Sequence, residues 1–498
     1  MNVNPITRLD YPDPDVIRVE DTYYMVSTTM HFMPGCEILQ SFDLVHWEHA
    51  TYVYETLDHT DAQQLKSGQN IYGQGMWAAS LRYHEGRFCI CFVANDTRKT
   101  YLYTSEKIDG PWKKQLIEGF YHDGSLLFDE DGRNYIVYGN DEIWITELNE
   151  DLTAPKKDGL HRLLVSDHKN PELGYEGSHI QKINGYYYIF LVHSLRDRWM
   201  RTEACFYSDS LEGEFTGGDV LCDDRGYCGQ GVAQGGIVDT PDGKWYAMLF
   251  QDSGAVGRIP ILLPVTWKDH FPFFGQNGHV PEEIEVHSTR PGYIYQPLVG
   301  SDDFCNGLLP RWQFNHDPDP RYYYLDALQG TYTITTREVC TELTQAVNTL
   351  TQRMSYPSCA AEVTVDASAL KEGDVAGLCA LQSCYAAVGI TKHHGKYEVL
   401  MLDKKEDGIL DMTEGTVVES HQMDFRLEAD FCNMKDEARC YYRVNKGDWL
   451  PIGTVHKLYF KLDHFTGCRF GLFCYAAEET GGSACFRDFK YYDVDEIS

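Results

Sequence analysis

The feature that most constrains the fold is a pattern of apolar strand, two-residue turn and aromatic-rich strand that occurs five times. Turns such as Asp-Gly and Asn-Gly between apolar runs strongly indicate β-hairpins. The hairpins pair Asp15–Val19 with Tyr23–Thr28, Ala79–Tyr83 with Arg87–Val93, Ser125–Phe128 with Asn134–Tyr138, Ser178–Lys182 with Tyr186–Val192, and Gly236–Val238 with Trp245–Phe250. Successive turns are 46 to 64 residues apart, which leaves room for two further strands per repeat. Four-stranded units repeated around an axis make a β-propeller, so the pattern predicts five blades in an all-β chain.

One position of the repeat carries polar and aromatic side chains. It lies eight residues before each hairpin turn and is occupied by Asp13, Trp77, Asp123, Glu176 and Gln234. Because the first strand of each hairpin should line the central channel, these five side chains are expected to form a ring at one end of the axis. A single aspartate there would be read as a turn or capping residue. Three carboxylates in one ring cost electrostatic energy, which favours a catalytic use.

Three neighbouring carboxylates suit the hydrolysis of a glycosidic bond. That reaction needs a proton donor for the leaving oxygen and a second carboxylate that activates water or attacks the sugar. A third acid can keep the donor protonated near neutral pH. The competing use is to hold a hard cation such as calcium, but the ring lacks the further oxygen ligands that such a site needs. The Trp77 side chain fits better as a platform for a sugar ring.

Several motifs, in order along residues 4–295, resemble glycoside hydrolase family 43. They are Tyr11–Ile17, Met76–Ala78, Asp123–Gly132 and Tyr175–Gly177. The resemblance implies a five-bladed, inverting enzyme, in agreement with the repeat count. By the same resemblance Asp13 is the general base, Glu176 the general acid, and Asp123 the residue that modulates the pKa of the acid and orients it.

The resemblance also suggests residues that contact the substrate. Arg258 matches an arginine that reaches the pocket and contacts sugar and carboxylates, and His31 with Phe32 match a stretch that walls the terminal sugar subsite. Loop packing is an equally good interpretation of His31 and Phe32. Gln234 stands where many members carry a histidine that helps to hold a central metal or water cluster. We therefore expect no required cofactor, and a structural calcium ion in the channel is the alternative that Gln234 argues against.

The repeated pattern of strand, turn and strand stops after Leu298. We therefore predict a propeller over residues 1–298 and a second domain over residues 299–498. Longer alternating strands at regular spacing indicate a two-sheet β-sandwich. It resembles the concanavalin-like domain that follows the propeller in family 43 β-xylosidases. Its role is either a lid or carbohydrate contact, or stabilisation of the propeller and assembly of a homo-oligomer. The expected strands are Thr331–Thr335, Ala360–Val365, Ala386–Thr391, Tyr397–Leu402, Phe425–Phe431, Ala438–Val444, Lys457–Leu462, Cys468–Tyr475 and Ala484–Val494.

The net charge of −32 excludes nucleic acid and anionic membrane surfaces as partners and leaves small neutral oligosaccharides open. The N-terminal residues have neither the basic start nor the apolar run of a signal peptide. Without a secretion signal, the scattered cysteines are interpreted as reduced thiols. These features predict a cytoplasmic protein.

The leading hypothesis is an exo-acting β-xylosidase, with or without α-L-arabinofuranosidase activity, that acts on short oligosaccharides. An arabinan-active hydrolase of the same family is the nearest alternative. A sugar-binding propeller without turnover is the alternative from another class, and the complete set of acid, base and modulator argues against it.

Overall fold

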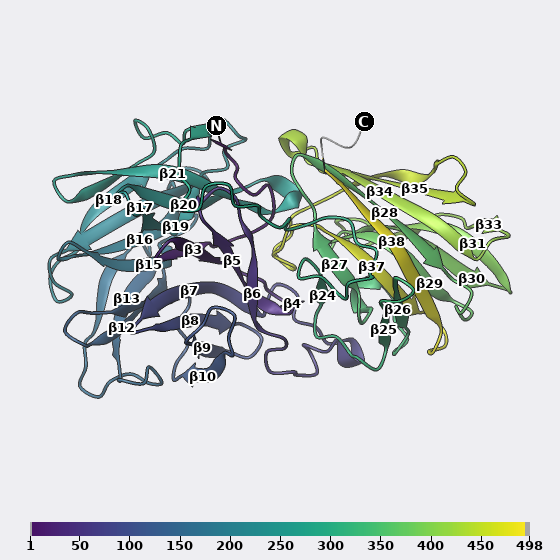
Figure 1. Ribbon diagram of the computed structural model, residues 1–498, viewed down its shortest axis with the longest axis horizontal. Helices are drawn as coiled ribbons and strands as arrows, with labels where there is room; N and C mark the ends of the chain where they lie inside the picture. The colour runs from purple at the N-terminus through teal and green to yellow at the C-terminus, as the bar shows by residue number, and fades with distance from the viewer. Residues whose placement is uncertain (1, 494–498) are drawn as a thin grey trace.

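The computed structural model describes residues 2–493 and shows two all-β domains in contact along one side (Figure 1). The first domain is a propeller of five four-stranded sheets, and the second is a sandwich of two larger sheets. Both parts of the predicted architecture are confirmed. In the part of the chain that the structure describes, no helix has the length and apolarity that crossing a bilayer requires.

Each blade is an antiparallel sheet of four strands, and the predicted hairpin forms its first two strands. The blades, in chain order, are β2 (Asp15–Val19), β3 (Thr22–Val26), β5 (Gly35–Ser41) and β6 (Glu48–Tyr54); β7 (Met76–His84), β8 (Arg87–Ala94), β9 (Lys99–Ser105) and β10 (Lys113–Ile117); β11 (Ser125–Phe128), β12 (Asn134–Asn140), β13 (Glu142–Leu148) and β14 (His161–Ser166); β15 (Glu176–Ile183), β16 (Tyr186–Ser194), β17 (Arg201–Ser208) and β18 (Thr216–Leu221); and β19 (Ala233–Asp239), β20 (Trp245–Asp252), β21 (Arg258–Lys268) and β22 (Phe271–Phe274).

Apolar side chains fill the spaces between neighbouring blades. The structure has one buried cluster for each of the five blade-to-blade contacts, and the cluster between the last and first blades includes Val16 and Met248. Burying a side chain of this size stabilises the fold by about 1.5–3 kcal/mol. The first strands of the blades contact one another around the axis, so they are the innermost strands, as the repeat predicted.

The ring is closed by the N-terminal segment. Strand β1 (Asn2–Val3) pairs with β23 (Glu283–Ile284), which follows the last blade. The Asn4 amide group donates to the carbonyl of Leu262 in β21 at 2.8 Å, and its oxygen accepts from the Leu262 backbone N–H at 3.0 Å. The first residues thus hold the last blade through backbone groups.

The sandwich consists of a nine-stranded and a seven-stranded sheet. The larger sheet runs in the order β32 (Leu410–Met412), β31 (Lys396–Lys404), β30 (Ala386–His393), β29 (Asp374–Leu381), β37 (Arg469–Ala476), β27 (Leu350–Arg353), β24 (Gln313–Asn315) and β4 (Phe32–Met33), with β33 (Thr416–Val418) also beside β31. The smaller sheet runs in the order β25 (Tyr323–Asp326), β26 (Thr331–Thr335), β38 (Ser483–Asp493), β28 (Ser358–Asp366), β34 (Gln422–Asp430), β35 (Glu437–Val444) and β36 (Leu450–Lys457).

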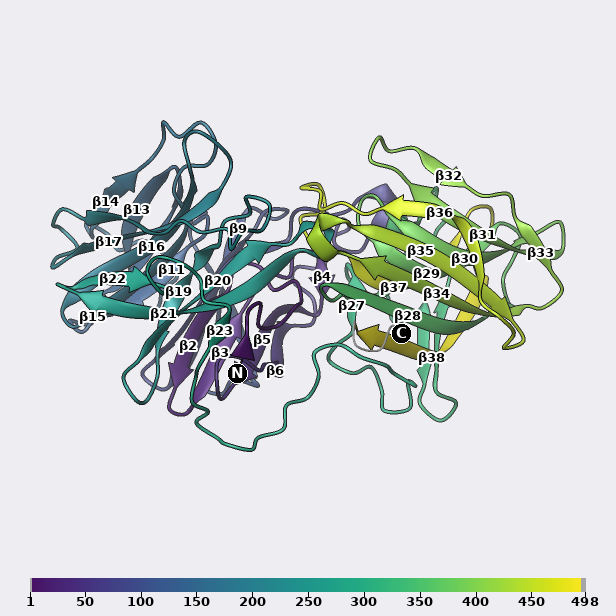
Figure 2. The same cartoon turned by 90° about the horizontal axis from the view of Figure 1, so that it is seen from above.

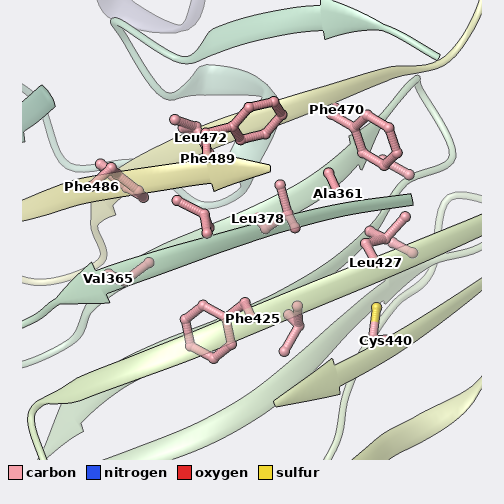
Figure 3. Packing of buried hydrophobic residues seen from close by; sticks show 14 of the residues in the cluster. Ala361, Val365, Leu378, Phe425, Leu427, Cys440, Phe470, Leu472, Phe486 and Phe489 are labelled. Atoms are coloured by element: carbon pink, nitrogen blue, oxygen red, sulfur yellow. The ribbon is translucent and has the colours of Figure 1, made fainter. Parts of the chain in front are cut away.

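Alternate residues of facing strands form the sandwich core. Figure 3 shows Phe425 and Leu427 of one sheet, with Leu378 and Phe470 of the other, in a single apolar layer. Residues 2–493 also contain four short 3-10 turns: Lys66–Gly68, Gly254–Val256, Leu343–Gln345 and Cys432–Met434.

One predicted strand is wrong. The expected strand Lys457–Leu462 overlaps the structure only at its first residue, because β36 ends at Lys457. The segment between β36 and β37 is instead a loop that reaches the propeller. Leu458 of this loop is buried in the core and Phe460 lies 5.9 Å from Arg258 of the propeller, whereas Leu462 is exposed.

The two domains are joined by shared structure as well as by the chain. The last propeller strand, β23, ends at Ile284, and the predicted boundary between residues 298 and 299 lies in the connection that leads to β24 (Figure 2). Strand β4 leaves the first blade and pairs with β24 at the edge of the sandwich sheet. The buried ion pair between Arg353 of the sandwich and Glu37 of the propeller, at 2.9 Å, adds a polar link across the same interface.

Candidate active site

The backbone at the predicted ring position is unusual in every blade. Asp13, Asp123 and Gln234 adopt positive φ angles of 53°, 47° and 62°. In the second, fourth and fifth blades the ladder between the first two strands is interrupted beside Trp77, Glu176 and Gln234. Bulges and left-handed residues re-aim side chains and are concentrated at functional sites. The ring side chains are therefore turned away from the regular pleat.

Asp13 is held by groups on both of its oxygens. Its Oδ1 accepts from Nη1 of Arg258 at 2.9 Å, and its Oδ2 accepts from the Thr28 hydroxyl at 2.6 Å. Both members of the Asp13–Arg258 ion pair are almost fully buried. A buried carboxylate with a cationic partner and a hydroxyl donor is fixed in position by charge-assisted hydrogen bonds.

Arg258 is also contacted by the second domain. Phe465, from the loop between β36 and β37, places its ring 4.5 Å from the Arg258 guanidinium and 5.5 Å from the Trp77 ring. Phe465 has a positive φ of 56°, a backbone conformation that is costly for an aromatic residue and persists where the surroundings enforce it. The sandwich domain therefore forms part of the site that the propeller ring begins.

Asp123 and Glu176 both approach the same nitrogen of an imidazole. Nε2 of His122 is 3.6 Å from Oδ2 of Asp123 and 3.7 Å from Oε2 of Glu176. The Asn140 amide donates to Oε2 of Glu176 at 2.8 Å, and the Gly177 N–H donates to Oδ2 of Asp123 at 3.0 Å. Asp123 thus fixes the backbone next to Glu176.

The electrostatics of this group follow from burial and from like charges. Burial raises the pKa of Asp123 to about 6; the charges of Glu176 and Asp13 act in the same direction, and His122 opposes them. The Asp123 charge, with those of Glu176 and Asp13, raises the pKa of His122 to about 9 against its burial. At neutral pH an imidazolium therefore lies among the carboxylates, and all three carboxylates influence one another.

The other ring members close the site. Trp77 lies 5.7 Å from the His122 ring in an edge-to-face arrangement, and its indole N–H has no partner. Gln234 lies against Gly177. A Cβ atom at residue 177 would come within 2.8 Å of the Gln234 side chain, so this position requires glycine. The structure brings Asp13, Trp77, Asp123, Glu176 and Gln234 together with Arg258.

His31 and Phe32 lie elsewhere, in the interface between the domains. Both are buried; the His31 ring packs against Phe32 at 4.3 Å and against His316 of the sandwich at 4.8 Å. The Phe32 ring is covered by the Arg469 guanidinium at 3.4 Å. The pairing of β4 with the sandwich sheet explains these positions, which agree with the loop-packing alternative. Contact of either ring with a sugar stays a prediction.

Sequence reasoning did not single out His122 or Phe465. His122 directly precedes Asp123, so a histidine next to a ring carboxylate was an available signal. Phe465 belongs to a loop more than 450 residues from Asp13 in the sequence, and no local sequence pattern indicates where one domain contacts another.

Two places in the propeller have side chains that could attract a cation. Within residues 2–493, His122, Asp123 and Glu176 form a group whose ligand atoms lie within 4.8 Å of one another. A metal-bound histidine must be neutral, and the raised pKa of His122 disfavours that form. Acid–base chemistry therefore accounts for this group better than metal binding does.

An arginine side chain, Arg82, lies in the channel, where a calcium ion was the alternative. The Arg82 guanidinium donates to Asp15 at 2.7 Å, to Ser125 at 2.7 Å and to the backbone oxygens of Leu126 and Ile180. These partners belong to the inner strands of three other blades. Burial acts against the ionised form of Asp15, but Arg82 and His179 hold its pKa below the usual value. A guanidinium already supplies the positive charge there.

Comparisons with known proteins identify the family of the chain. Residues 3–272 match the profile described as Glycosyl hydrolases family 43, and residues 301–492 match the Beta xylosidase C-terminal Concanavalin A-like domain. A solved structure described as bifunctional GH43-CE from Bacteroides eggerthii is 41% identical with a TM-score of 0.93; it covers 100% of this chain, which spans 64% of that one. A Beta-xylosidase of Formosa agariphila is 26% identical over 99% of this chain and 89% of its own length. A non-reducing end alpha-L-arabinofuranosidase of Bacteroides ovatus is 24% identical over 82% of this chain and 79% of its own length.

Proposed function

Because the chain belongs to glycosyl hydrolases family 43, we propose that it is an exo-acting, inverting hydrolase that releases a terminal pentose from small neutral oligosaccharides. The family match confirms the resemblance read from the motifs, and the second match confirms the concanavalin-like assignment of the sandwich. The observation that carries the proposal is the convergence of Asp13, Asp123 and Glu176 on one site, with Arg258 and His122 between and beside them.

We assign a separate role to each carboxylate. Glu176 donates a proton to the oxygen of the departing sugar, since it is the carboxylate of the three that is least buried and is oriented by Asn140. Asp13 accepts a proton from the attacking water, because Arg258 and Thr28 bind its two oxygens and hold it in position. Asp123 fixes the backbone beside Glu176 through Gly177 and adds negative charge near the donor.

The sugar released is xylose, arabinose or both. A relative named for xylosidase activity and one named for arabinofuranosidase activity both support a pentose. An arabinan-active hydrolase is the alternative within the family. Rates on 4-nitrophenyl β-xyloside, 4-nitrophenyl α-L-arabinofuranoside and linear arabinan, measured with one preparation, decide between these substrates.

The test of the acid and base uses leaving groups of different quality. Glu176→Ala should lose most of its rate on a disaccharide, where protonation of the leaving oxygen is hard, and regain much of it on a 2,4-dinitrophenyl glycoside. Asp13→Ala should lose a similar rate on both, because water must be activated whatever departs. General acid or base assistance is typically worth about 10²–10⁴-fold.

A matched control exists at the opposite end of the propeller axis. Glu130 lies in the turn between β11 and β12, where its carboxylate is exposed, and Glu130→Ala should keep full activity on both substrates. Equal losses on both substrates for Glu176→Ala and Asp13→Ala would contradict the division of roles. Sugar binding without turnover of any glycoside would favour the non-catalytic alternative.

A cytoplasmic location and the assembly of a homo-oligomer stay predictions. Fractionation of cells followed by immunoblotting tests the first, and light scattering of the purified protein tests the second. Hydrolysis by a carboxylate pair needs no cofactor, so activity should survive exhaustive dialysis against a chelator.

A further inference from the structure

A continuous row of arginine and aromatic side chains runs from the catalytic base to the protein surface. Phe465 covers Arg258, which lies 5.2 Å from the Phe250 ring; Arg201 lies 5.2 Å from the same ring, and the Trp199 ring lies 5.2 Å from Arg201. Arg258 and Arg201 thus flank Phe250, with Asp13 bound to the first arginine. The row places Trp199 three contacts from Arg258, with Arg201 and Phe250 between them.

Trp199 belongs to the same blade as Glu176 and to the same end of that blade. Glu176, at the start of β15, pairs with Val192 of β16, and the last residue of β16, Ser194, pairs with Arg201. The connection between β16 and β17 over residues 195–200 therefore emerges on the face that carries the ring. Burial and the nearby Arg258 lower the pKa of Arg201 to about 10, while the charges of Glu176 and Asp13 act on it in the opposite direction, which agrees with this position.

The connection is held in one conformation. The backbone N–H of Leu195 donates to the carbonyl of Met200 at 3.1 Å, and the N–H of Met200 donates to the Ser194 hydroxyl at 2.9 Å. Arg196 forms an ion pair with the buried Asp167 of the preceding loop. A ring carried by such a short, closed loop loses little conformational freedom when it binds a ligand.

Trp199 differs from every other tryptophan of the chain. All nine lie within residues 2–493, and Trp199 alone is exposed, at 45% of its surface. One face of its indole is supported by Arg201, which leaves the other available. A flat, rigid, amphipathic ring next to a hydrolytic site is suited to stacking on a pyranose.

We propose that Trp199 is the binding platform for the leaving-group sugar, the neutral pyranose on the reducing side of the scissile bond. The inference rests on the proposed function. The general acid must face the oxygen that departs, so the leaving sugar lies on the side of Glu176, and Trp199 is the exposed aromatic side chain that the Glu176 blade presents on that side. The terminal pentose is bound by the buried ring residues, and the next sugar along the chain is bound by Trp199.

The experiment compares substrates with and without a leaving sugar. A pentosyl fluoride fills the terminal subsite alone, whereas a disaccharide of the same pentose also places a ring on Trp199. Trp199→Ala should lower kcat/KM for the disaccharide about tenfold. It should leave the pentosyl fluoride, and the inhibition constant of the free pentose, within about twofold of the unaltered protein.

Two further variants make the result specific. Trp199→Phe keeps a flat ring and should retain most disaccharide activity. Phe273→Ala removes an aromatic side chain of 49% exposure from the outermost strand of the fifth blade, β22, and should change neither substrate.

Each contrary result has its own meaning. Unchanged disaccharide hydrolysis in Trp199→Ala, or an equal loss on the pentosyl fluoride, would overturn the leaving-sugar platform while the proposed function stands. No turnover of any pentosyl fluoride by the unaltered protein would overturn the proposed function and the platform with it.

Discussion

Truncation of Phe465 tests whether the sandwich domain takes part in catalysis. Its ring lies 4.5 Å from the buried Arg258 guanidinium, a desolvated cation–π contact worth about 2 kcal/mol. Its contact with Trp77 at 5.5 Å adds about 0.5–1.5 kcal/mol. Phe465→Ala removes both contacts and admits water to the Asp13–Arg258 pair. If about half of this energy holds the site in its productive geometry, kcat/KM falls by roughly tenfold, at 1.4 kcal/mol per factor of ten.

The assay is steady-state hydrolysis of an aryl pentoside, with the thermal unfolding midpoint measured in parallel. The control is Tyr324→Ala, which removes an exposed aromatic ring from β25 of the same domain. The control should match the unaltered protein in both measurements. A kcat/KM of Phe465→Ala within twofold of the unaltered value would refute the idea that the sandwich completes the site.

Three further changes test the electrostatics. Asp123→Asn removes a negative charge beside the proton donor, so the alkaline limb of the pH–rate profile should move to lower pH; an unmoved limb would contradict the modulating role. His464, buried and stacked on Tyr72 at the domain interface, has its pKa lowered by burial to about 3. Below about pH 6.5 the unfolded chain therefore binds a proton at His464 that the folded chain does not bind, so acid lowers the unfolding free energy. His464→Phe removes this effect and should make the decrease in unfolding free energy between pH 8 and pH 5 smaller by about 2 kcal/mol, as measured by urea unfolding. Arg82→Met leaves Asp15 buried without its cation and should cost about 3–5 kcal/mol in the same assay; a loss below 1 kcal/mol would contradict the channel role of Arg82.

The propeller and its ring could be predicted from the sequence because a repeat multiplies weak signals. One hairpin before one aspartate says little, but five equivalent positions place Asp13, Asp123 and Glu176 at one end of one axis. The strands of the sandwich gave no such repetition. The segment Asp374–Leu381, for example, is apolar on both faces and buried, so the alternation that marks a half-exposed strand is missing, and β29 went unpredicted.

The contacts between the domains could not be predicted in the same way. Phe32 has the pattern of a residue beside the ring, yet it joins the edge of a sheet whose other strands begin nearly 300 residues later. Phe465 reaches Arg258 from the connection between two expected strands, Lys457–Leu462 and Cys468–Tyr475. The contact of one domain with another depends on complementary surfaces, and the residues of such surfaces do not recur at regular intervals in the sequence.

The central claim, that Asp13 activates water for direct displacement while Glu176 protonates the leaving group, is tested most directly by the anomer formed first. Inversion needs room for water between the base and the sugar, at carboxyl separations of about 6.5–9.5 Å, against about 5–5.5 Å for a retaining pair. Proton NMR of the first minutes of hydrolysis of a β-xyloside, recorded before mutarotation, should show α-xylose. If the protein turns over only α-L-arabinofuranosides, the same experiment should show the β anomer of arabinose. A first-formed product of unchanged configuration would mean that a carboxylate attacks the sugar itself, and it would contradict the role given to Asp13.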